Sequence, residues 1–255
     1  MPATPTKPEP CSTRLAVVDL ARGLAIVQMV IYHFIYDLNY FGWVRLQLTV
    51  QPGFVAWRSA IVSQFLLVAG IGIGLGAASR RPADRFWRRW AQIAGAAALV
   101  SAASAFLFGP RLIWFGILHF VALALLFTRP LPRLGPANLA IGALAVTLGV
   151  AVHDARFDGP TLSWIGFVAH KPATEDYVPV LPWIGVVMIG IGLAAVWQRS
   201  HFSLPAVLRD LQQAPWRILR WLGRWPLTVY LVHQPLLMGA LELVRIAGGP
   251  VFRTG

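Results

Sequence analysis

Long apolar runs separated by short polar connections make up most of this chain of 255 residues. Runs of about 17 to 25 apolar residues are long enough to cross ~30 Å of hydrocarbon as helices. The pattern predicts an all-α fold, a polytopic membrane helix bundle of about seven transmembrane helices. The predicted spans cover roughly residues 17–41, 58–78, 90–108, 112–127, 136–152, 178–197 and 226–244.

Polar segments bound this bundle at both ends. Residues 1–13 are polar and rich in proline, which predicts a disordered cytoplasmic tail. Residues 14–248 then form a single transmembrane domain, and residues 249–255 a short second tail.

Composition agrees with a membrane location, because 57% of the residues are hydrophobic, only 13% are charged and the mean hydropathy is +0.63. The formal net charge of +12 raises the question of nucleic-acid binding. The arginines, however, stand in short connections between apolar runs, whereas nucleic-acid binding needs a contiguous basic face. We therefore expect the lipid bilayer as a partner, and no nucleic acid. Cys11 is the only cysteine, which excludes internal disulfides and cysteine-based zinc sites.

The placement of basic residues predicts the orientation. Lys and Arg are most frequent in the N-terminal tail and in the connections that a seven-span topology places on the same side. Because basic residues favour cytoplasmic loops, we expect a cytoplasmic N-terminus. Two of these connections, residues 80–90 and 204–224, mix Arg with Trp, Phe and Leu. This composition is typical of interfacial helices at headgroup level, and the alternative is a phosphate-binding rim for a cytosolic ligand.

The first predicted span carries a stripe of ionisable residues. At about 100° per residue, Asp19, Arg22, His33 and Asp37 fall within roughly 60° of one another on one helix face. The stripe extends over about 27 Å at a rise of ~1.5 Å per residue. A charged side chain facing lipid would cost about 2.5–3.5 kcal/mol, so this face should turn toward the bundle interior or a hydrated cavity.

Each of these groups has a functional and a structural interpretation. Asp19 and Arg22, at i and i+3, can simply pair with each other at the helix end. His33 has a carboxylate, Asp37, one turn further on, and a carboxylate can orient a histidine and keep it basic, as a general base requires. The structural alternative for any histidine in the bundle is a hydrogen bond to a neighbouring carbonyl or hydroxyl.

Two further histidines lie inside predicted spans. Counting helical rise from the predicted span ends places His119 at the depth of His33 and Asp37. The same counting places His233 at the depth of Arg22, so we predict an outer polar layer with His119 and an inner layer with His233. A histidine-based metal site needs three convergent ligands, and the pattern predicts none.

Glycines repeat within two of the spans. Gly70, Gly72, Gly74 and Gly76 lack the strand that precedes a nucleotide-binding loop. We interpret them, together with Gly190 and Gly192, as small residues that allow close helix packing.

The first span resembles the opening helix of the heparan-α-glucosaminide N-acetyltransferase catalytic-domain family. The shared pattern is an acidic residue, then Arg-Gly, then a histidine separated from the arginine by ten residues. In this chain these are Asp19, Arg22, Gly23 and His33, and the pattern continues through Tyr36 and Asp37. Three more segments resemble bacterial members of this family: FGILH (115–119), DYVPVLPWIG (176–185) and LTVYLVHQP (227–235).

This resemblance implies a transmembrane acyltransferase of a bacterial inner membrane. Such an enzyme uses acetyl-CoA from the cytoplasm as cosubstrate, without a metal, to acetylate a hydroxyl or amine of a saccharide-like acceptor at the outer face. The resemblance gives His33 the catalytic role, either as general base or as carrier of the acetyl group. The other expected site residues are Asp37 and His119 as further catalytic groups, Asp19, Arg22, His233 and Gln234 on the donor side, and Tyr36, Asp176 and Trp183 on the acceptor side.

Two other functions compete with this hypothesis. A transporter or flippase of a small anion or glycolipid could use the same polar stripe as a relay, although the spans show no internal repeat. A non-catalytic scaffold would leave the aligned ionisable groups unexplained. A homo-oligomer is compatible with each of these functions.

Overall fold

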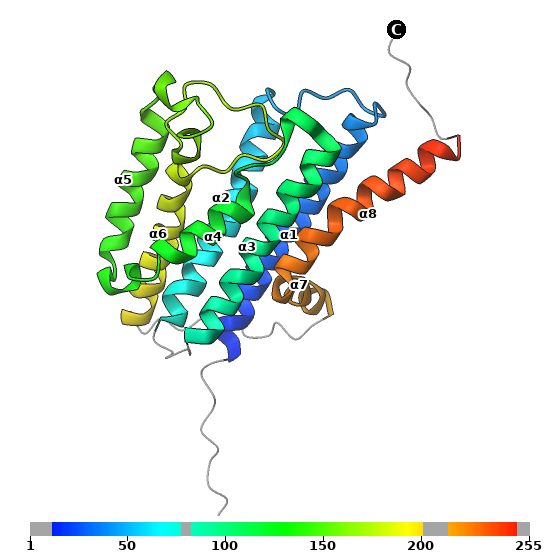
Figure 1. The fold of residues 1–255 in the computed structure, drawn as a ribbon. Coiled ribbons are helices and arrows are strands. Elements are labelled where there is room, and N and C mark those ends of the chain that lie inside the picture. Colours follow the sequence, from blue (N-terminus) through cyan, green and yellow to red (C-terminus); the bar gives the residue numbers. More distant parts are fainter. Residues whose placement is uncertain (1–11, 78–82, 201–213, 249–255) are drawn as a thin grey trace, which may run out of the picture. The chain divides into compact units, whose positions relative to one another are not determined.

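The computed structural model describes residues 12–77, 83–200 and 214–248, which form α-helices joined by connections, the longest described one between α5 and α6 (Figure 1). The elements are α1 (Ser12–Tyr40), α2 (Pro52–Gly76), α3 (Ala83–Phe108), η1 (Gly109–Arg111), α4 (Ile117–Phe127), η2 (Leu131–Leu134), α5 (Ala137–Ala151), η3 (Ala155–Phe157), η4 (Ser163–Ile165), α6 (Val180–Arg199), α7 (Ala214–Arg224) and α8 (Pro226–Ile246). Within these residues the β-type pairing is limited to an isolated parallel bridge between Phe115 and Tyr177. The predicted all-α fold is confirmed.

Five helices are long and apolar enough to cross a membrane: α1, α2, α3, α6 and α8. The chain is therefore a multi-pass membrane protein, as predicted. The other two predicted spans correspond to shorter helices: α4 has 11 residues and α5 has 15. At ~1.5 Å per residue α4 is about 16 Å long, roughly half the hydrocarbon thickness.

The prediction of a continuous span over residues 112–127 is thus wrong in its first part. Residues 112–116 are apolar but not helical. They run beside residues 174–178, where the Val178 amide donates to the Phe115 carbonyl (3.2 Å) and the Glu175 amide donates to the Arg111 carbonyl (3.2 Å). Hydrophobicity alone does not distinguish an apolar helix from an apolar extended segment whose backbone groups find partners elsewhere.

Some predicted features lie outside the described residues. These are most of the N-terminal tail, the C-terminal tail, and parts of the two predicted interfacial segments. The described part of the second interfacial segment forms α7, which exposes Trp216, Ile218 and Trp221 beside exposed Arg217 and Arg224. Exposed rings and cations on one short helix agree with the predicted interfacial character.

The chain divides into two compact units. Unit 1 contains α1, the start of α2, α7 and α8, and both α7 and α8 pack on α1 (Figure 1). The α1–α7 contact depends on Gly23 and Gly223. A methyl group on Gly23 would overlap the carbonyl of Leu219, and one on Gly223 would overlap the carbonyl of Asp19. Only glycine allows the two backbones to approach this closely.

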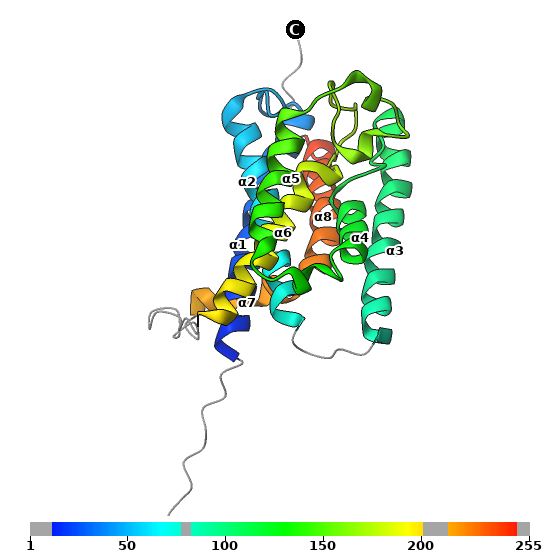
Figure 2. The same cartoon turned by 90° about the vertical axis from the view of Figure 1, so that its left-hand side faces the viewer.

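Unit 2 contains the remainder of α2 and α3 to α6. Helices α5 and α6 lie side by side (Figure 2) and run antiparallel. Helices α2 and α6 approach closely at Gly70 and Gly190, where an added methyl group would overlap backbone atoms of the facing helix. The predicted packing role of these two glycines is confirmed. The core of this unit consists of Leu66, Phe120, Ala124, Val178, Val187 and Ile191.

The glycine crossing makes a prediction for unit 1. We expect Gly223→Ala to destabilise the protein by about 1–3 kcal/mol, because the added methyl group meets a backbone carbonyl that cannot rotate away. Thermal unfolding in detergent measures this loss. The matched control is Gly239→Ala in α8, where no atom lies within 4 Å of the added methyl group, and an unfolding temperature equal in both variants would contradict the close crossing.

Candidate functional site

The ionisable stripe of α1 faces the two helices that pack on it in unit 1. Asp19 and Arg22 contact α7, and Asp37 and His33 contact α8. All four side chains have contacts on a neighbouring helix, as the predicted orientation toward the bundle requires. The stripe contributes to two polar clusters, which we call the α7 cluster and the α8 cluster.

The α7 cluster is a structural ion pair. The Arg22 guanidinium donates from Nη1 to Asp19 Oδ1 (2.9 Å) and to the Gly223 carbonyl (3.0 Å). Arg224 Nε lies 3.7 Å from Asp19 Oδ2. Asp19 and Arg22 therefore pair, as the structural interpretation expected, and in addition they hold the C-terminal end of α7 on α1.

The α8 cluster contains a deeply buried carboxyl group. Asp37 is only 1% exposed, and Gln234 Nε2 donates to its Oδ1 atom at 2.6 Å. Asp37 Oδ2 and Gln234 Oε1 are buried and have no hydrogen-bond partner. A buried carboxyl oxygen without a donor is costly, so this cluster can take up a group that donates hydrogen bonds.

The two histidines of this cluster are in ring contact. The centroids of His33 and His233 lie 5.0 Å apart with an interplanar angle of 67°. His33 Nδ1 lies 2.9 Å from the Met29 carbonyl, and His233 Nδ1 lies 2.7 Å from the Tyr230 carbonyl. Because a carbonyl oxygen only accepts hydrogen bonds, each Nδ1 carries the proton. In each neutral ring the lone pair is therefore on Nε2.

This arrangement corrects two predictions. His233 lies with His33 and not in the predicted inner layer with Arg22, and Gln234, predicted on the donor side, contacts Asp37. Counting residues from a helix end fixes depth only for helices with known ends and tilt, and α8 runs at an angle to α1 (Figure 1). Asp37 bonds to Gln234, while His33 is held by a carbonyl of its own helix, so a direct orientation of His33 by Asp37 is not what the geometry shows.

Aromatic side chains surround the histidine pair. Tyr32, itself 7% exposed, contacts His33 edge-on at 6.1 Å and Trp57 at 5.4 Å. Tyr230 lies 5.8 Å from His233. The predicted acceptor contact Tyr36 is half-buried beside Asp37 in the sequence of α1. Aromatic rings therefore contact both imidazoles.

In unit 2, His119 uses both ring nitrogens in hydrogen bonds. The Gly116 amide donates to Nδ1 (3.3 Å), so Nδ1 is the acceptor and the proton is on Nε2. Nε2 lies 3.1 Å from Ser101 Oγ, and this hydroxyl donates to the Ile113 carbonyl at 2.6 Å. In this geometry His119 holds the start of α4, and its predicted catalytic role stays a prediction.

The segment before α4 depends on side chains from two other parts of unit 2. Ser104 Oγ accepts from the Ile113 amide (2.9 Å), and Asp176 Oδ2 accepts from the Ile117 amide (2.8 Å). Thr174 Oγ1 donates to the Leu112 carbonyl at 2.7 Å. Asp176 was expected only through the resemblance, and Ser104 and Thr174 were not predicted. Ser104 is an isolated hydroxyl in an apolar run and Thr174 is one of several polar residues in a connection, and neither position carries a distinguishing signal.

The remaining predicted acceptor contact, Trp183 of α6, is half-buried and packs against the core of unit 2. Nearby, Tyr177 donates its hydroxyl to the Ser163 carbonyl at 2.6 Å. Burial, with a smaller contribution from Asp158, raises the pKa of Tyr177 to about 12, so the phenol stays protonated at neutral pH. In the structure it acts as a hydrogen-bond donor.

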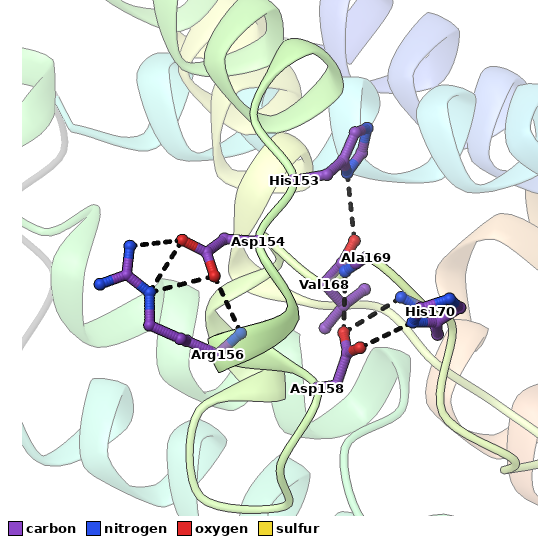
Figure 3. A network of polar contacts seen from close by, with 7 residues as sticks. All are labelled: His153, Asp154, Arg156, Asp158, Val168, Ala169 and His170. Atoms are coloured by element: carbon purple, nitrogen blue, oxygen red, sulfur yellow. Dashed lines mark hydrogen bonds and ion pairs between the residues drawn. The ribbon is translucent and has the colours of Figure 1, made fainter.

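The connection between α5 and α6 forms a compact polar loop (Figure 3). Asp158 accepts from the Ala169 amide (2.8 Å) and the His170 amide (3.0 Å), and its second oxygen lies 2.9 Å from His170 Nδ1. The hydrogen bonds from the backbone and then the side chain of His170 lower the pKa of Asp158. Hydrogen bonds from Arg156 likewise lower the pKa of Asp154. His153 and His170 are exposed, as expected for residues in a connection.

Among the described residues, no group of three or more His, Cys, Asp or Glu side chains is placed to hold a metal ion. The α8 cluster itself combines two histidines with one carboxyl group and an amide. Its unpaired nitrogen and oxygen atoms carry lone pairs that can accept hydrogen bonds or protons.

Comparison with known families gives one finding. The sequence model described as "Heparan-alpha-glucosaminide N-acetyltransferase, catalytic" matches residues 14–235. Neither the comparison with curated proteins nor that with solved structures gives a match.

The Asp176 contact generates a stability prediction. We expect Asp176→Ala to lower the stability by about 0.5–2 kcal/mol, because the Ile117 amide at the start of α4 loses its acceptor. Asp176→Asn keeps an oxygen at this position and should retain most of the stability. Asp84→Ala, on the exposed first turn of α3, is the control in thermal unfolding, and a loss as large in this control would argue against a specific role of Asp176.

The loop generates a pH prediction. Because the pKa of Asp158 is lowered in the folded loop, its bonds to Ala169 and His170 contribute fully above the ordinary carboxyl pKa of about 3.9. They are lost as the pH falls through the lowered value. Amide chemical shifts of residues 169 and 170 should therefore change together at a pH below 3.9. This transition should be missing in Asp158→Asn, and its persistence there would refute the assignment.

Proposed function

The chain belongs to the heparan-alpha-glucosaminide N-acetyltransferase catalytic family, and from this membership we propose that it transfers an acetyl group from cytosolic acetyl-CoA to a saccharide-like acceptor at the outer face. The family implies acetyltransferase activity, and the apolar helices imply a location in the bilayer. The acetyl donor, the acceptor class with its hydroxyl or amine, and the location in a bacterial inner membrane with a cytoplasmic N-terminus are parts of the proposal.

One observation carries the proposal: the imidazole of His33 is oriented as a base. Its Nδ1 proton is held by the Met29 carbonyl, which leaves Nε2 with a free lone pair. His33 sits at the histidine position of the family pattern, on a helix face with the Asp37 carboxyl buried one turn away. A general base needs this combination of a fixed ring and an available lone pair.

In the proposed reaction, His33 Nε2 takes the proton from the acceptor hydroxyl or amine. The acceptor oxygen or nitrogen then forms a bond to the thioester carbonyl carbon, and the carbon–sulfur bond breaks. His33 returns the proton to the leaving sulfur, so the products are the acetylated acceptor and the free thiol. Base catalysis of this kind contributes about 10²–10⁴ in rate.

An acetyl-histidine intermediate is a second route that the same geometry allows, because the lone pair of His33 Nε2 could also attack the thioester carbonyl carbon. In that route the thiol leaves first, and the acceptor hydroxyl or amine then takes the acetyl group from Nε2 and gives up its proton. Both routes place a positive charge on the ring of His33 in passing, so this charge does not distinguish them.

The proposed donor and acceptor contacts change in one respect. Arg22, next to the exposed arginines of α7, stays assigned to the phosphates of the donor, since guanidinium groups bind phosphate well. Asp19 stays on the donor side as the carboxylate that accepts from Arg22 and orients it. His233 and Gln234 leave the donor side, because they contact His33 and Asp37. Tyr36, on the same helix as His33, stays assigned to the acceptor. For Asp176 and Trp183 the acceptor role rests on the family resemblance alone, since Asp176 binds the Ile117 amide and Trp183 packs against the core of unit 2.

The test is turnover by the full chain purified in detergent. With acetyl-CoA and free glucosamine as probes, we expect thiol release coupled to product formation, and a loss of at least about 10²-fold in His33→Ala. His153→Ala, which removes an exposed histidine of the loop, is the matched control and should retain full activity.

Unchanged turnover in His33→Ala would refute the proposed role of this histidine. A transporter, the competing function, would move solute across reconstituted vesicles while leaving the thioester intact. Transport with an intact thioester would therefore replace the acetyltransferase proposal.

A further inference from the structure

His233 presents a buried acceptor atom that has nothing to accept. The residue is 9% exposed, and its Nε2 atom is buried with no hydrogen-bond partner. Folded proteins leave few buried polar atoms unpaired, and each such atom needs an explanation. A partner that is present in only one state of the reaction is one such explanation.

The backbone of α8 fixes what this nitrogen can do. His233 Nδ1 lies 2.7 Å from the Tyr230 carbonyl and 3.1 Å from the Val229 carbonyl. Nδ1 is therefore the protonated atom, and Nε2 can only accept. The ring of His33, which contacts that of His233 at 5.0 Å, has the same tautomer by the same argument.

Two acceptors cannot hydrogen-bond to each other. With both rings neutral, the two Nε2 atoms have no proton to share between them. A single proton on His33 Nε2 would turn this atom into a donor, and the ring that contacts His33 carries, at His233 Nε2, a buried acceptor without a donor. We infer that His233 is a positioning residue whose Nε2 accepts a hydrogen bond from protonated His33 during the reaction. This inference rests on the proposed function, in which His33 takes a proton from the acceptor.

The groups around the pair suit an added positive charge. Asp37 contributes a carboxyl group whose Oδ2 is buried without a partner, and Gln234, the neighbour of His233, anchors its other oxygen. Tyr32 of α1 and Tyr230 of α8 contact the two rings. Arg58 of α2 is the nearby cation and interacts with Tyr32. The helix of His33 thus also carries a carboxyl group, Asp37, and one tyrosine contacts each of the two imidazole rings.

A contact made only after proton transfer stabilises the transition state and not the bound substrate. Its loss should therefore lower kcat and leave KM nearly unchanged. A purely structural histidine would instead change stability, or would change both constants together. This difference separates the two roles.

The kinetic experiment uses the full chain in detergent with acetyl-CoA and free glucosamine. We expect His233→Leu, which has no acceptor atom, to lower kcat by about tenfold to a hundredfold, the usual value of a hydrogen bond to a charged group. KM should stay within about twofold. His233→Gln keeps an acceptor oxygen and should recover most of kcat, as should His233→Ala with added imidazole. Thr228→Ala, an exposed position on α8, is the control.

The outcomes are distinguishable. Wild-type kcat in His233→Leu, with His33→Ala inactive, would overturn this inference and keep the proposed function. Equal losses in the Leu and Gln variants, with raised KM or lowered unfolding temperature, would show a structural role and also overturn it. Normal turnover in His33→Ala would overturn the proposed function itself.

Histidine ¹⁵N chemical shifts give a readout that needs no turnover. As the pH is lowered, uptake of one proton should change the Nε2 chemical shifts of His33 and His233 at the same pH. The His33 shift should move toward that of a protonated nitrogen, and the His233 shift toward that of a nitrogen that accepts a hydrogen bond. In His33→Ala the shift of His233 Nε2 should lose this step. Separate changes at different pH values in the wild type would overturn the inference.

Discussion

The cost of placing ionisable side chains in an apolar environment governs the structure of unit 1. The stripe of α1 cannot face lipid without a penalty of a few kcal/mol for each charge. Helix α7 therefore presents a backbone carbonyl to Arg22, and α8 presents an amide to Asp37. The same constraint explains the glycine contact between α1 and α7, because a guanidinium can reach a carbonyl of the facing helix only when the two backbones approach closely.

A related constraint acts on the backbone in unit 2. Where the apolar chain leaves the helical conformation before α4, its amide groups lose their intrahelical acceptors, and an unpaired amide is costly in an apolar setting. Ser104 and Asp176 supply oxygens for two of these amides, and His119 accepts from a third. The polar residues of this region are therefore explained by the hydrogen bonds that α4 needs in order to begin at Ile117.

The α8 cluster differs from these satisfied networks. The α7 cluster and the start of α4 have partners for their main polar groups, whereas the α8 cluster keeps unpaired acceptors on Asp37, His233 and Gln234. Such a set of lone pairs is unfavourable at rest and favourable when a proton arrives, which is the behaviour expected of a catalytic site. The two clusters on α1 thus differ in whether their polar atoms have hydrogen-bond partners.

Local properties of the sequence determined the apolar helices and the face of α1 that carries Asp19, Arg22, His33 and Asp37. Helical period and apolar length are set by neighbouring residues, and so they can be predicted without knowledge of the fold. Only the tertiary structure decided that His233 meets His33, that α4 begins late, and which ring nitrogens hold protons. These features depend on the tilt and register between helices and on which carbonyl lies within reach, and residues far apart in the chain determine them together.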